Sequence, residues 1–314
     1  MTDKTSLGDR MKQYEATSQT TLLRRTPIII RIDGRAFHTF TKRIVAEYPQ
    51  SERGFTDADV MARYVVDSAL ADDPFSIKLH TVMTKTAKDL FDGVQNAVFI
   101  YTQSDEISIL LRDWDKHETQ QWFGGNVQKM VSLSASIATE SFNHYFMTQF
   151  ESPRRPKAHF DSRVYNIPQE EVTNYFIWRQ QDASRNSVQM LGHFFFSQKQ
   201  MHGKSNNEVQ DMMMERGVNW NDLATWKKRG SAVYKKKSSF MGVRDLDAVV
   251  TDLGIPIFTQ DRDFVERHLT VSSDEREEFR QALESFAKDS AVFNDVTGED
   301  ANAMMKAVHQ EKDR

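Results

Sequence analysis

Two short apolar runs about a third of the way along the chain constrain its fold most. Residues 97–101 and residues 107–111 each have the length and the β-branched or aromatic content of a strand. The connection between them, Gln103–Glu106, is too short for a crossover, so the two runs are expected to pair as an antiparallel hairpin. The chain therefore has to build a sheet around this hairpin.

Further strands and helices are expected on both sides of the hairpin. The run from Arg25 to Asp33 is typical of a buried strand that begins after Pro27, and residues 159–167 indicate another strand. Apolar periodicity favours helices at 56–70, 75–90, 127–150 and 169–183, and Thr56 is a candidate N-cap for the first of them. The order strand, helices, strand, strand, helix, strand is that of a split βαβ sheet. We therefore expect an α+β fold with a ferredoxin-like core of the polymerase-palm kind, helical additions and a helical C-terminal region.

Charge is divided unevenly along the chain. Residues 241–314 hold 17 of the 45 acidic residues but only 9 of the 41 basic ones, which leaves a small positive balance for residues 1–240. This predicts a palm-like domain at 1–240 and an acidic, mainly helical extension at 241–314. A cluster of basic residues in the first domain can hold phosphates, although a solvated surface is the more ordinary interpretation: Lys227, Lys228, Arg229, Lys235, Lys236 and Lys237.

Composition excludes several classes of protein. No run of about eighteen apolar residues is present, so no membrane partner is expected, and residues 1–11 lack the apolar core of a signal peptide. Cys is absent, which excludes disulfides, zinc–thiolate sites and a thiol nucleophile. By default, a cytoplasmic protein is expected.

Two carboxylates are expected at neighbouring strand ends. Asp33 ends the first strand, and Asp105 lies in the hairpin turn. In a split βαβ sheet the first strand neighbours the hairpin, so these side chains can lie close together. Like charges at such a distance repel, and a divalent cation relieves that repulsion. Magnesium prefers hard oxygen ligands, and two ions can clamp both oxygens of a phosphoryl transfer.

The residues beside these carboxylates refine the predicted metal site. Gly34 lets the chain turn directly after Asp33, and its carbonyl oxygen is a further candidate ligand. Glu106 follows Asp105, but successive strand residues point to opposite faces, which makes direct ligation by Glu106 less favoured. An isolated Asp-Gly or Ser-Asp-Glu segment is more often a turn or a cap, so the prediction depends on both acids meeting.

Five blocks of sequence occur in the order found in a known family. Arg31-Ile-Asp-Gly-Arg-Ala-Phe-His-Thr-Phe40 matches the signature R-x-D-G-R-x-F-H-x-F, and Tyr101-Thr-Gln-Ser-Asp-Glu-Ile-Ser108 matches a second carboxylate motif. Phe160-Asp-Ser-Arg-Val164, Trp178-Arg-Gln-Gln-Asp182 and Lys228-Arg-Gly230 follow. By these blocks, which span roughly residues 20 to 240, the chain resembles the histidine-tRNA guanylyltransferase family.

The resemblance implies a magnesium-dependent nucleotidyltransferase that extends RNA in the 3′–5′ direction. The RNA 5′ end carries the activated phosphate, the 3′-hydroxyl of the incoming nucleotide attacks it, and ATP activates a 5′-monophosphate end. The implied substrates are ATP, GTP or other nucleoside triphosphates, with tRNA or another structured RNA. The family tends to form tetramers, which makes a homotetramer the expectation.

The resemblance also implies roles for individual residues. Two Mg²⁺ ions would be held by Asp33, Gly34 and Asp105, with Asp33, Asp105 and Glu106 forming the catalytic set. A run of backbone N–H groups at a turn can cradle phosphates. Nucleotide contacts are implied for Arg31, Gly34, Arg35, Ala36, Phe37, His38, Ser104 and Lys129. Contacts to RNA or phosphate are implied for Arg163, Arg179, Asp182, Arg185, Asn186, Lys228 and Arg229. Taken alone, several of these would be ordinary caps, surface charges or a structural histidine.

Departures from the family pattern indicate which branch the chain is similar to. The eukaryotic branch has a Cys-His-Ile-Asn-Asn block, associated with the histidine anticodon, where this chain has Ala183-Ser-Arg-Asn-Ser187. That segment and Trp122-Phe-Gly-Gly125 resemble the bacterial and archaeal members. The implied activity is therefore template-dependent repair of tRNA 5′ ends.

Three alternatives stay open. A guanylyltransferase would add a single G to histidine tRNA. A nucleotide cyclase or an ordinary 5′–3′ polymerase would share the palm carboxylates. A non-catalytic RNA-binding module would use exposed aromatic residues on its strands, and no such aromatic-rich pattern is visible in the expected strands.

Overall fold

The computed structural model describes residues 6–46, 74–116, 118–150, 157–240 and 243–270. The chain divides into two compact units, residues 1–268 and 269–314. Of the second unit only Leu269 and Thr270 are described. The helices predicted at 56–70 and in the C-terminal tail lie outside the described residues.

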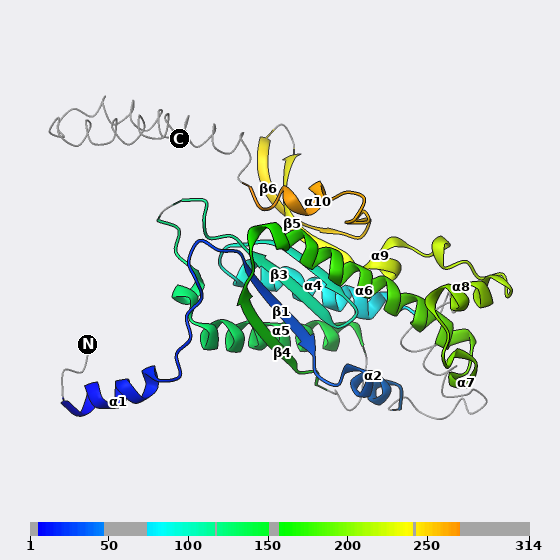
Figure 1. Cartoon of the computed structure of the whole chain (residues 1–314), viewed down its shortest axis with the longest axis horizontal. Helices are drawn as coiled ribbons and strands as arrows, with labels where there is room; N and C mark the ends of the chain where they lie inside the picture. The colour runs from blue at the N-terminus through cyan, green and yellow to red at the C-terminus, as the bar shows by residue number, and fades with distance from the viewer. Residues whose placement is uncertain (1–5, 47–73, 117, 151–156, 241–242, 271–314) are drawn as a thin grey trace. The chain divides into compact units, whose positions relative to one another are not determined.

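One antiparallel sheet of six strands organises the first unit (Figure 1). Its order is β4-β1-β3-β2-β5-β6. The strands are β1 (Ile28–Gly34), β2 (Ala97–Gln103), β3 (Glu106–Leu111), β4 (Phe160–Asn166), β5 (Ser231–Phe240) and β6 (Val243–Asp252). The predicted hairpin is confirmed: β2 pairs with β3, and Gln103 lies opposite Glu106. Asp33 lies opposite Glu106 from β1, so the end of β1 reaches the hairpin turn.

Helices complete the α+β fold expected from the sequence. The longer helices are α1 (Ser6–Ala16), α2 (Phe37–Ala46), α4 (Ile77–Gly93), α5 (Val127–Gln149), α6 (Gln169–Phe195) and α8 (Asn206–Met214). The short ones are α7 (Gln198–Met201), α9 (Thr225–Arg229), α10 (Asp263–Glu266) and the 3₁₀ turns η2 (Trp122–Gly125) and η3 (Trp220–Asp222). None of the described helices is long and apolar enough to cross a membrane.

Side-chain caps fix where the two core helices begin. The Ser76 hydroxyl accepts a hydrogen bond from the Leu79 amide at 3.2 Å, at the start of α4. Asn126 accepts one from the Lys129 amide at 3.0 Å, at the start of α5. Each cap satisfies a donor that the helix itself leaves unpaired, which stabilises these helix ends by about 1 kcal/mol each.

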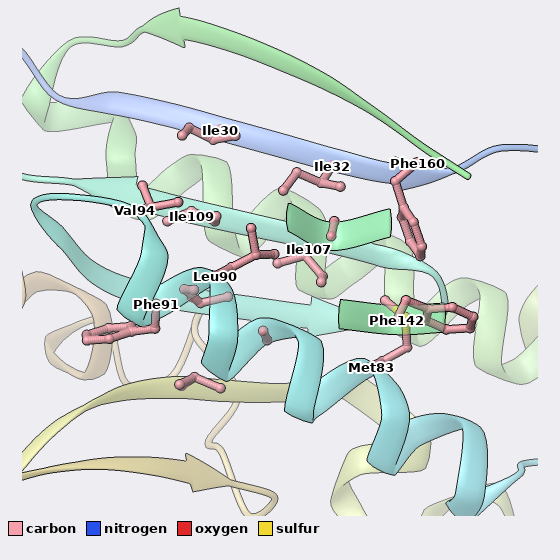
Figure 2. Close-up of a cluster of buried hydrophobic side chains, with 14 of the residues drawn as sticks. Ile30, Ile32, Met83, Leu90, Phe91, Val94, Ile107, Ile109, Phe142 and Phe160 are labelled. Atoms are coloured by element: carbon pink, nitrogen blue, oxygen red, sulfur yellow. The ribbon is translucent and has the colours of Figure 1, made fainter. Parts of the chain in front are cut away.

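The main hydrophobic core lies between the sheet and helices α4 and α5 (Figure 2). Alternate residues of β1 and β3 point into it, among them Ile30, Ile32, Ile107 and Ile109, all fully buried. Phe142 of α5 packs among them. On the other face, Arg31 of β1 and Glu106 and Ser108 of β3 contact side chains of α6, so the sheet is covered on both sides there.

Two segments differ from the sequence-based expectation. Helix α6 continues to Phe195 rather than ending near residue 183, because Val188 and Leu191 beyond that point are buried. The boundary expected at residue 240 falls between β5 and β6, which pair with each other, and the compact unit continues to His268. Residues 243–252, expected in a mainly helical extension, form a strand.

Candidate functional site

The end of β1 and the hairpin turn meet through the backbone. The Gly34 amide donates to the Asp105 carbonyl oxygen at 3.0 Å. Burial raises the pKa of the Asp105 carboxyl to about 6, and the negative charge of Asp33 adds to this rise, while a hydrogen bond from Ser104 opposes it. The structure therefore brings Asp33 and Asp105 within electrostatic range of each other, at one end of the sheet.

Gly34 makes the close approach of Asp105 possible. A Cβ atom at Gly34 would lie 2.9 Å from the Asp105 Cβ, 3.0 Å from its Oδ2 and 2.5 Å from Phe37 Cδ2. The Asp105 carboxylate thus packs directly on the backbone that follows Asp33. Only a residue without a side chain leaves this space open.

The donor set suits a hard cation that also binds substrate. Two carboxylates and the Gly34 carbonyl supply oxygen atoms, which Mg²⁺ prefers. The partly desolvated, mutually repelling acids are the kind of pair that a cation stabilises. No group of three or more His, Cys, Asp or Glu side chains that could hold a metal occurs in the described part of the chain. The remaining ligands would therefore come from backbone, water and phosphate oxygens.

The turn after Gly34 presents backbone amides. Ala36 has a left-handed φ of 50°, and its carbonyl accepts from the amides of Thr39 and Phe40 as α2 begins. The Phe37 ring is buried against Phe40, with ring centroids 5.1 Å apart, and anchors the turn. Among the described residues, the amides of residues 36–38 find no hydrogen-bond acceptor, so they are available to an anion at the helix start.

The side chains of this turn have different surroundings. Arg35 and His38 are exposed, and the Arg35 amide donates to the His159 carbonyl oxygen at 2.8 Å. Phe37, expected to bind nucleotide, offers only its amide, because its side chain belongs to the core. On the hairpin side, Ser104 has a left-handed φ of 49° and donates to Asp105 Oδ1 at 3.0 Å. Ser104 therefore orients the Asp105 carboxylate.

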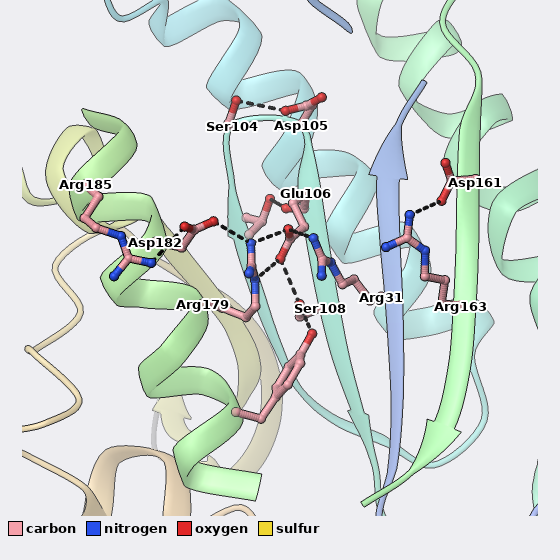
Figure 3. A network of polar contacts seen from close by, with 12 residues as sticks. Arg31, Ser104, Asp105, Glu106, Ser108, Asp161, Arg163, Arg179, Asp182 and Arg185 are labelled. Carbon is pink, nitrogen blue, oxygen red and sulfur yellow. Dashed lines mark hydrogen bonds and ion pairs between the residues drawn. The ribbon is translucent and has the colours of Figure 1, made fainter. Parts of the chain in front are cut away.

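Glu106 is held by two arginines on the face of the sheet that α6 covers (Figure 3). Its Oε1 and Oε2 accept from Arg179 Nε and Nη2, both at 2.7 Å. Arg31 Nη2 lies 3.0 Å from Oε2. Glu106 is 4% exposed, so both of its oxygens are already paired inside the protein. In this arrangement Glu106 positions the two arginines, and its carboxylate oxygens are not available to a metal ion.

Arg179 does not have the surroundings that its expected phosphate contact requires. It is 3% exposed and also pairs with Asp182 at 3.0 Å, so its charge is used inside the protein. Asp182 in turn pairs with Arg185 at 3.0 Å, and Arg185 keeps 54% of its side chain exposed. This chain of ion pairs links the buried Glu106 to the surface of α6, where Asn186 is also exposed.

The other candidate contacts lie on the surface around this site. Arg163 faces solvent from β4, opposite Arg31 in the sheet register, with Asp161 3.7 Å away. Lys129 is exposed in the first turn of α5.

The basic residues of α9 are attached to the end of β2. The Lys228 ammonium donates to the Asn221 carbonyl oxygen, and the Tyr101 hydroxyl donates to the Arg229 carbonyl oxygen at 2.7 Å. Gly230 has a left-handed φ of 78° and packs on the Thr102 carbonyl oxygen, only 2.5 Å from where a Cβ would lie.

Sequence reasoning missed the aromatic surroundings of the Glu106 cluster. The Tyr175 hydroxyl lies 2.7 Å from the Ser108 hydroxyl beneath Glu106. Trp178, the first residue of the W-R-Q-x-D block, is 47% exposed above the two arginines. The W-R-Q-x-D block is visible in the sequence, but only its position on α6 shows that the Trp178 side chain faces solvent.

Comparison with known proteins identifies the family. The family model for tRNAHis guanylyltransferase matches residues 8–70 and 67–168. A solved bacterial tRNA(His) guanylyltransferase-like protein in complex with ATP is 38% identical, with a TM-score of 0.70, over 85% of this chain and 100% of that chain. A second such structure, in complex with GTP, is 36% identical, with a TM-score of 0.67 over the same shares. The tRNA(His) guanylyltransferase of Schizosaccharomyces pombe is 28% identical over 233 residues, 70% of this chain and 77% of that protein.

The region matched by the family model contains the meeting point of the two carboxylates. The family model spans both carboxylates and the strand that carries Arg163, and the bacterial structures extend the similarity over most of the chain. The resemblance read from the five sequence blocks is confirmed, and this chain belongs to the tRNAHis guanylyltransferase family.

Proposed function

We propose that this protein adds nucleotides in the 3′–5′ direction to the 5′ end of tRNA or tRNA-like RNA, guided by a template. The observation that carries the proposal is the meeting of Asp33 and Asp105 beside the amides of residues 36–38, for which the described part of the chain offers no acceptor. That arrangement combines a cation site with a phosphate cradle. The bacterial relatives in complex with ATP and with GTP support nucleoside triphosphates as substrates.

The fold supports a palm-like interpretation of the core. Strands β1 to β4, with α4 and α5 between them, follow the order β-α-β-β-α-β and lie in the sheet as β4-β1-β3-β2. This order supports a split βαβ core. The hydrogen bond from the Gly34 amide to the Asp105 carbonyl oxygen joins the end of β1 to the β2–β3 turn, where a palm would hold its carboxylates.

We propose that different residues hold the metal ions, the triphosphate and the RNA. We propose that Asp33, Asp105 and the Gly34 carbonyl hold two Mg²⁺ ions, which when bound offset the charge of the phosphates and of the reacting oxygens. The amides of residues 36–38 hold the triphosphate, and Ser104 fixes the direction of the Asp105 carboxylate. We propose that Arg163 and Arg185, whose side chains are both more than half exposed, bind RNA phosphates.

In the proposed reaction, the 3′-hydroxyl oxygen of the incoming nucleotide forms a bond to the activated 5′-terminal phosphorus of the RNA. The bond from that phosphorus to its leaving group breaks. When the RNA begins with a 5′-triphosphate, the leaving group is pyrophosphate. A 5′-monophosphate end first reacts with ATP and releases pyrophosphate, and AMP leaves in the second step. The proton of the attacking hydroxyl passes to solvent.

The test is extension of a 5′-truncated tRNA. The protein is incubated with the RNA, ATP, GTP and Mg²⁺, and RNA 5′ ends are sequenced with templates that differ in the pairing nucleotide. We expect template-matched extension that is lost in Asp33→Ala and Asp105→Ala. Asp92→Ala, at an exposed carboxylate on α4, is the matched control and should keep wild-type activity. No extension of either 5′-monophosphate or 5′-triphosphate RNA would overturn the proposal.

The same products separate the alternatives. A single G added only to histidine tRNA, whatever the template, would favour the guanylyltransferase. Extension at the 3′ end or cyclic nucleotides would favour an ordinary polymerase or a cyclase. RNA binding that is indifferent to magnesium, with no product, would favour a non-catalytic module. The segment 183–187, which lacks the Cys-His-Ile-Asn-Asn block, favours template-dependent repair among these.

A further inference from the structure

Trp178 is a large apolar side chain that the fold leaves open. It lies on α6 and is 47% exposed. The guanidinium carbons of Arg179 and Arg31 lie 4.3 Å and 5.7 Å from its ring centroid. Both guanidinium groups bind the same Glu106 carboxylate, so they lie together on the side of the indole that faces the sheet. The described residues therefore leave the solvent side of the ring open to another flat group.

The support beneath the indole is rigid. Arg179 makes two 2.7 Å hydrogen bonds to Glu106 and a 3.0 Å ion pair with Asp182, and it is nearly fully buried. The Tyr175 ring packs edge-on against Trp178, with centroids 5.9 Å apart. A ring held in this way loses little conformational entropy when a ligand stacks on it, which favours binding.

Positive charge and the reaction centre both lie close to the indole. Arg31, beneath Trp178, is two residues before Asp33 on β1, a separation of roughly 7 Å along a strand. Arg163 lies opposite Arg31 on β4, and more than half of its side chain is exposed. Arg185 lies two helical turns beyond Trp178 on α6 and is also exposed. Phosphate groups fit beside this ring better than an apolar peptide would.

We propose that Trp178 is a stacking platform for a nucleobase of the substrate, which makes it a positioning residue that acts through the base. The inference rests on the proposed function and deepens it. Base–aromatic stacking is tolerant of sequence and typically strengthens binding by about 10-fold. The base belongs either to the 5′-terminal nucleotide of the RNA or to the bound nucleoside triphosphate, and both present the same chemistry to the ring.

The experiment compares ligands that differ only in the base. One pair is a 5′-triphosphorylated RNA hairpin, labelled at its 3′ end, and the same hairpin with an abasic first nucleotide. The other pair is GTP and ribose 5-triphosphate. Binding is measured for wild type, Trp178→Leu, which keeps an apolar cover over the arginines, and Trp178→Phe, which keeps an aromatic ring. Met190→Ala changes another exposed apolar residue of α6 and serves as the control.

We expect Trp178→Leu to weaken binding of the base-bearing ligand about 10-fold and to leave binding of the baseless ligand unchanged. The affinities of Trp178→Phe and Met190→Ala should stay within about 3-fold of wild type. An effect in the RNA pair assigns the platform to the RNA end, and an effect in the GTP pair assigns it to the nucleotide. Equal weakening of both members of a pair, or no weakening in either pair, would overturn the proposal.

A second measurement does not depend on the leucine variant. The difference in fluorescence between wild type and Trp178→Phe isolates the emission of Trp178, which a stacked base should quench and a baseless ligand should not. Absence of this difference would also overturn the proposal. RNA extension by wild type without any base-dependent coupling would refute the platform alone. Coupling without 3′–5′ extension would refute the proposed reaction and leave the platform standing.

Discussion

Replacing Gly34 with alanine tests how closely the end of β1 and the β2–β3 turn must approach each other. The added Cβ would lie 2.9 Å from the Asp105 Cβ and 2.5 Å from Phe37 Cδ2, where ordinary contacts begin at 3.4 Å. The φ of Gly34 lies outside the left-handed region, so alanine is compatible with the backbone itself. The change therefore acts through crowding and not through the conformation of the chain.

The size of the effect follows from these distances. Asp105 has to retreat by about 0.5 Å and the Phe37 ring by about 0.9 Å to restore ordinary contact. Crowding of this kind costs about 1–3 kcal/mol of folding free energy, which leaves a folded protein. Because a displacement of about 1 Å in a catalytic group lowers rates by about 100-fold, a shift of half that size should lower the extension rate by at least about 10-fold.

The assay is single-turnover extension of 5′-triphosphorylated, truncated tRNA at saturating GTP and Mg²⁺. Gly254→Ala is the matched control, because its new Cβ would meet Asp252 Oδ1 at 3.6 Å, an ordinary contact. A folded Gly34→Ala protein that extends RNA at the wild-type rate would refute the reasoning. Restoration of the rate by adding Phe37→Leu would show that the ring, and not the carboxylate, had been displaced.

Three further outcomes follow from the surroundings of the site. Burial raises the pKa of Asp105 to about 6. Without metal, the folded state therefore binds more protons than the unfolded state between about pH 4 and pH 6. The free energy of unfolding then falls as the pH rises through that window. Thermal melts in EDTA should therefore show Asp105→Asn melting above wild type at pH 7, with a difference that disappears near pH 4; a constant difference would contradict the assignment. Arg179→Met leaves the buried Glu106 with one arginine fewer and should lower the free energy of unfolding in urea by about 3 kcal/mol. The double change Arg179→Met and Glu106→Gln should lower the free energy of unfolding by less than the sum of the two single changes. Strict additivity of the two changes would argue against a direct ion pair between these side chains. Gly230→Ala places a Cβ 2.5 Å from the Thr102 carbonyl oxygen at a left-handed φ, so urea unfolding should show a loss of about 1–3 kcal/mol, and an unchanged midpoint would refute that contact.

The sequence was sufficient for the elements whose patterning is local. The β2–β3 hairpin and α5 begin and end within a few residues of the predicted positions, because apolar spacing marks them directly. The meeting of Asp33 and Asp105 followed from the strand order alone. Those inferences needed only the periodicity of the chain and the short reach of a hairpin turn.

The length of α6 could not be predicted in the same way. The segment 183–187 is rich in Ser and Asn, residues that favour caps and turns over helix interiors. The structure overrides this preference with distant contacts. Ser187 accepts a hydrogen bond from Trp220 Nε1 at 2.9 Å, and Leu191 is fully buried in a second hydrophobic cluster with Met213. Contacts with residues more than twenty positions away decide where this helix ends.

The role of Glu106 was hidden for a similar reason. Its position beside Asp105 suggests a shared task, and alternation along a strand predicts only that the two point to different faces. Nothing local indicates that Arg179, on a helix 73 residues further along the chain, would take both of its oxygens. The difference between a metal ligand and a buried anchor is decided by which residues α6 brings over the sheet.

The attachment of α9 to β2 has a mechanical consequence. Tyr101 holds the Arg229 carbonyl, Thr102 pairs with Ser231, and two residues further along stands Ser104, at the start of the turn that carries Asp105. A force on α9 is thus transmitted to the turn of Ser104 and Asp105 through a few covalent bonds and one 2.7 Å hydrogen bond. A ligand that restrains α9 would therefore also restrain this turn, whereas a ligand bound only at residues 36–38 would not act through this path.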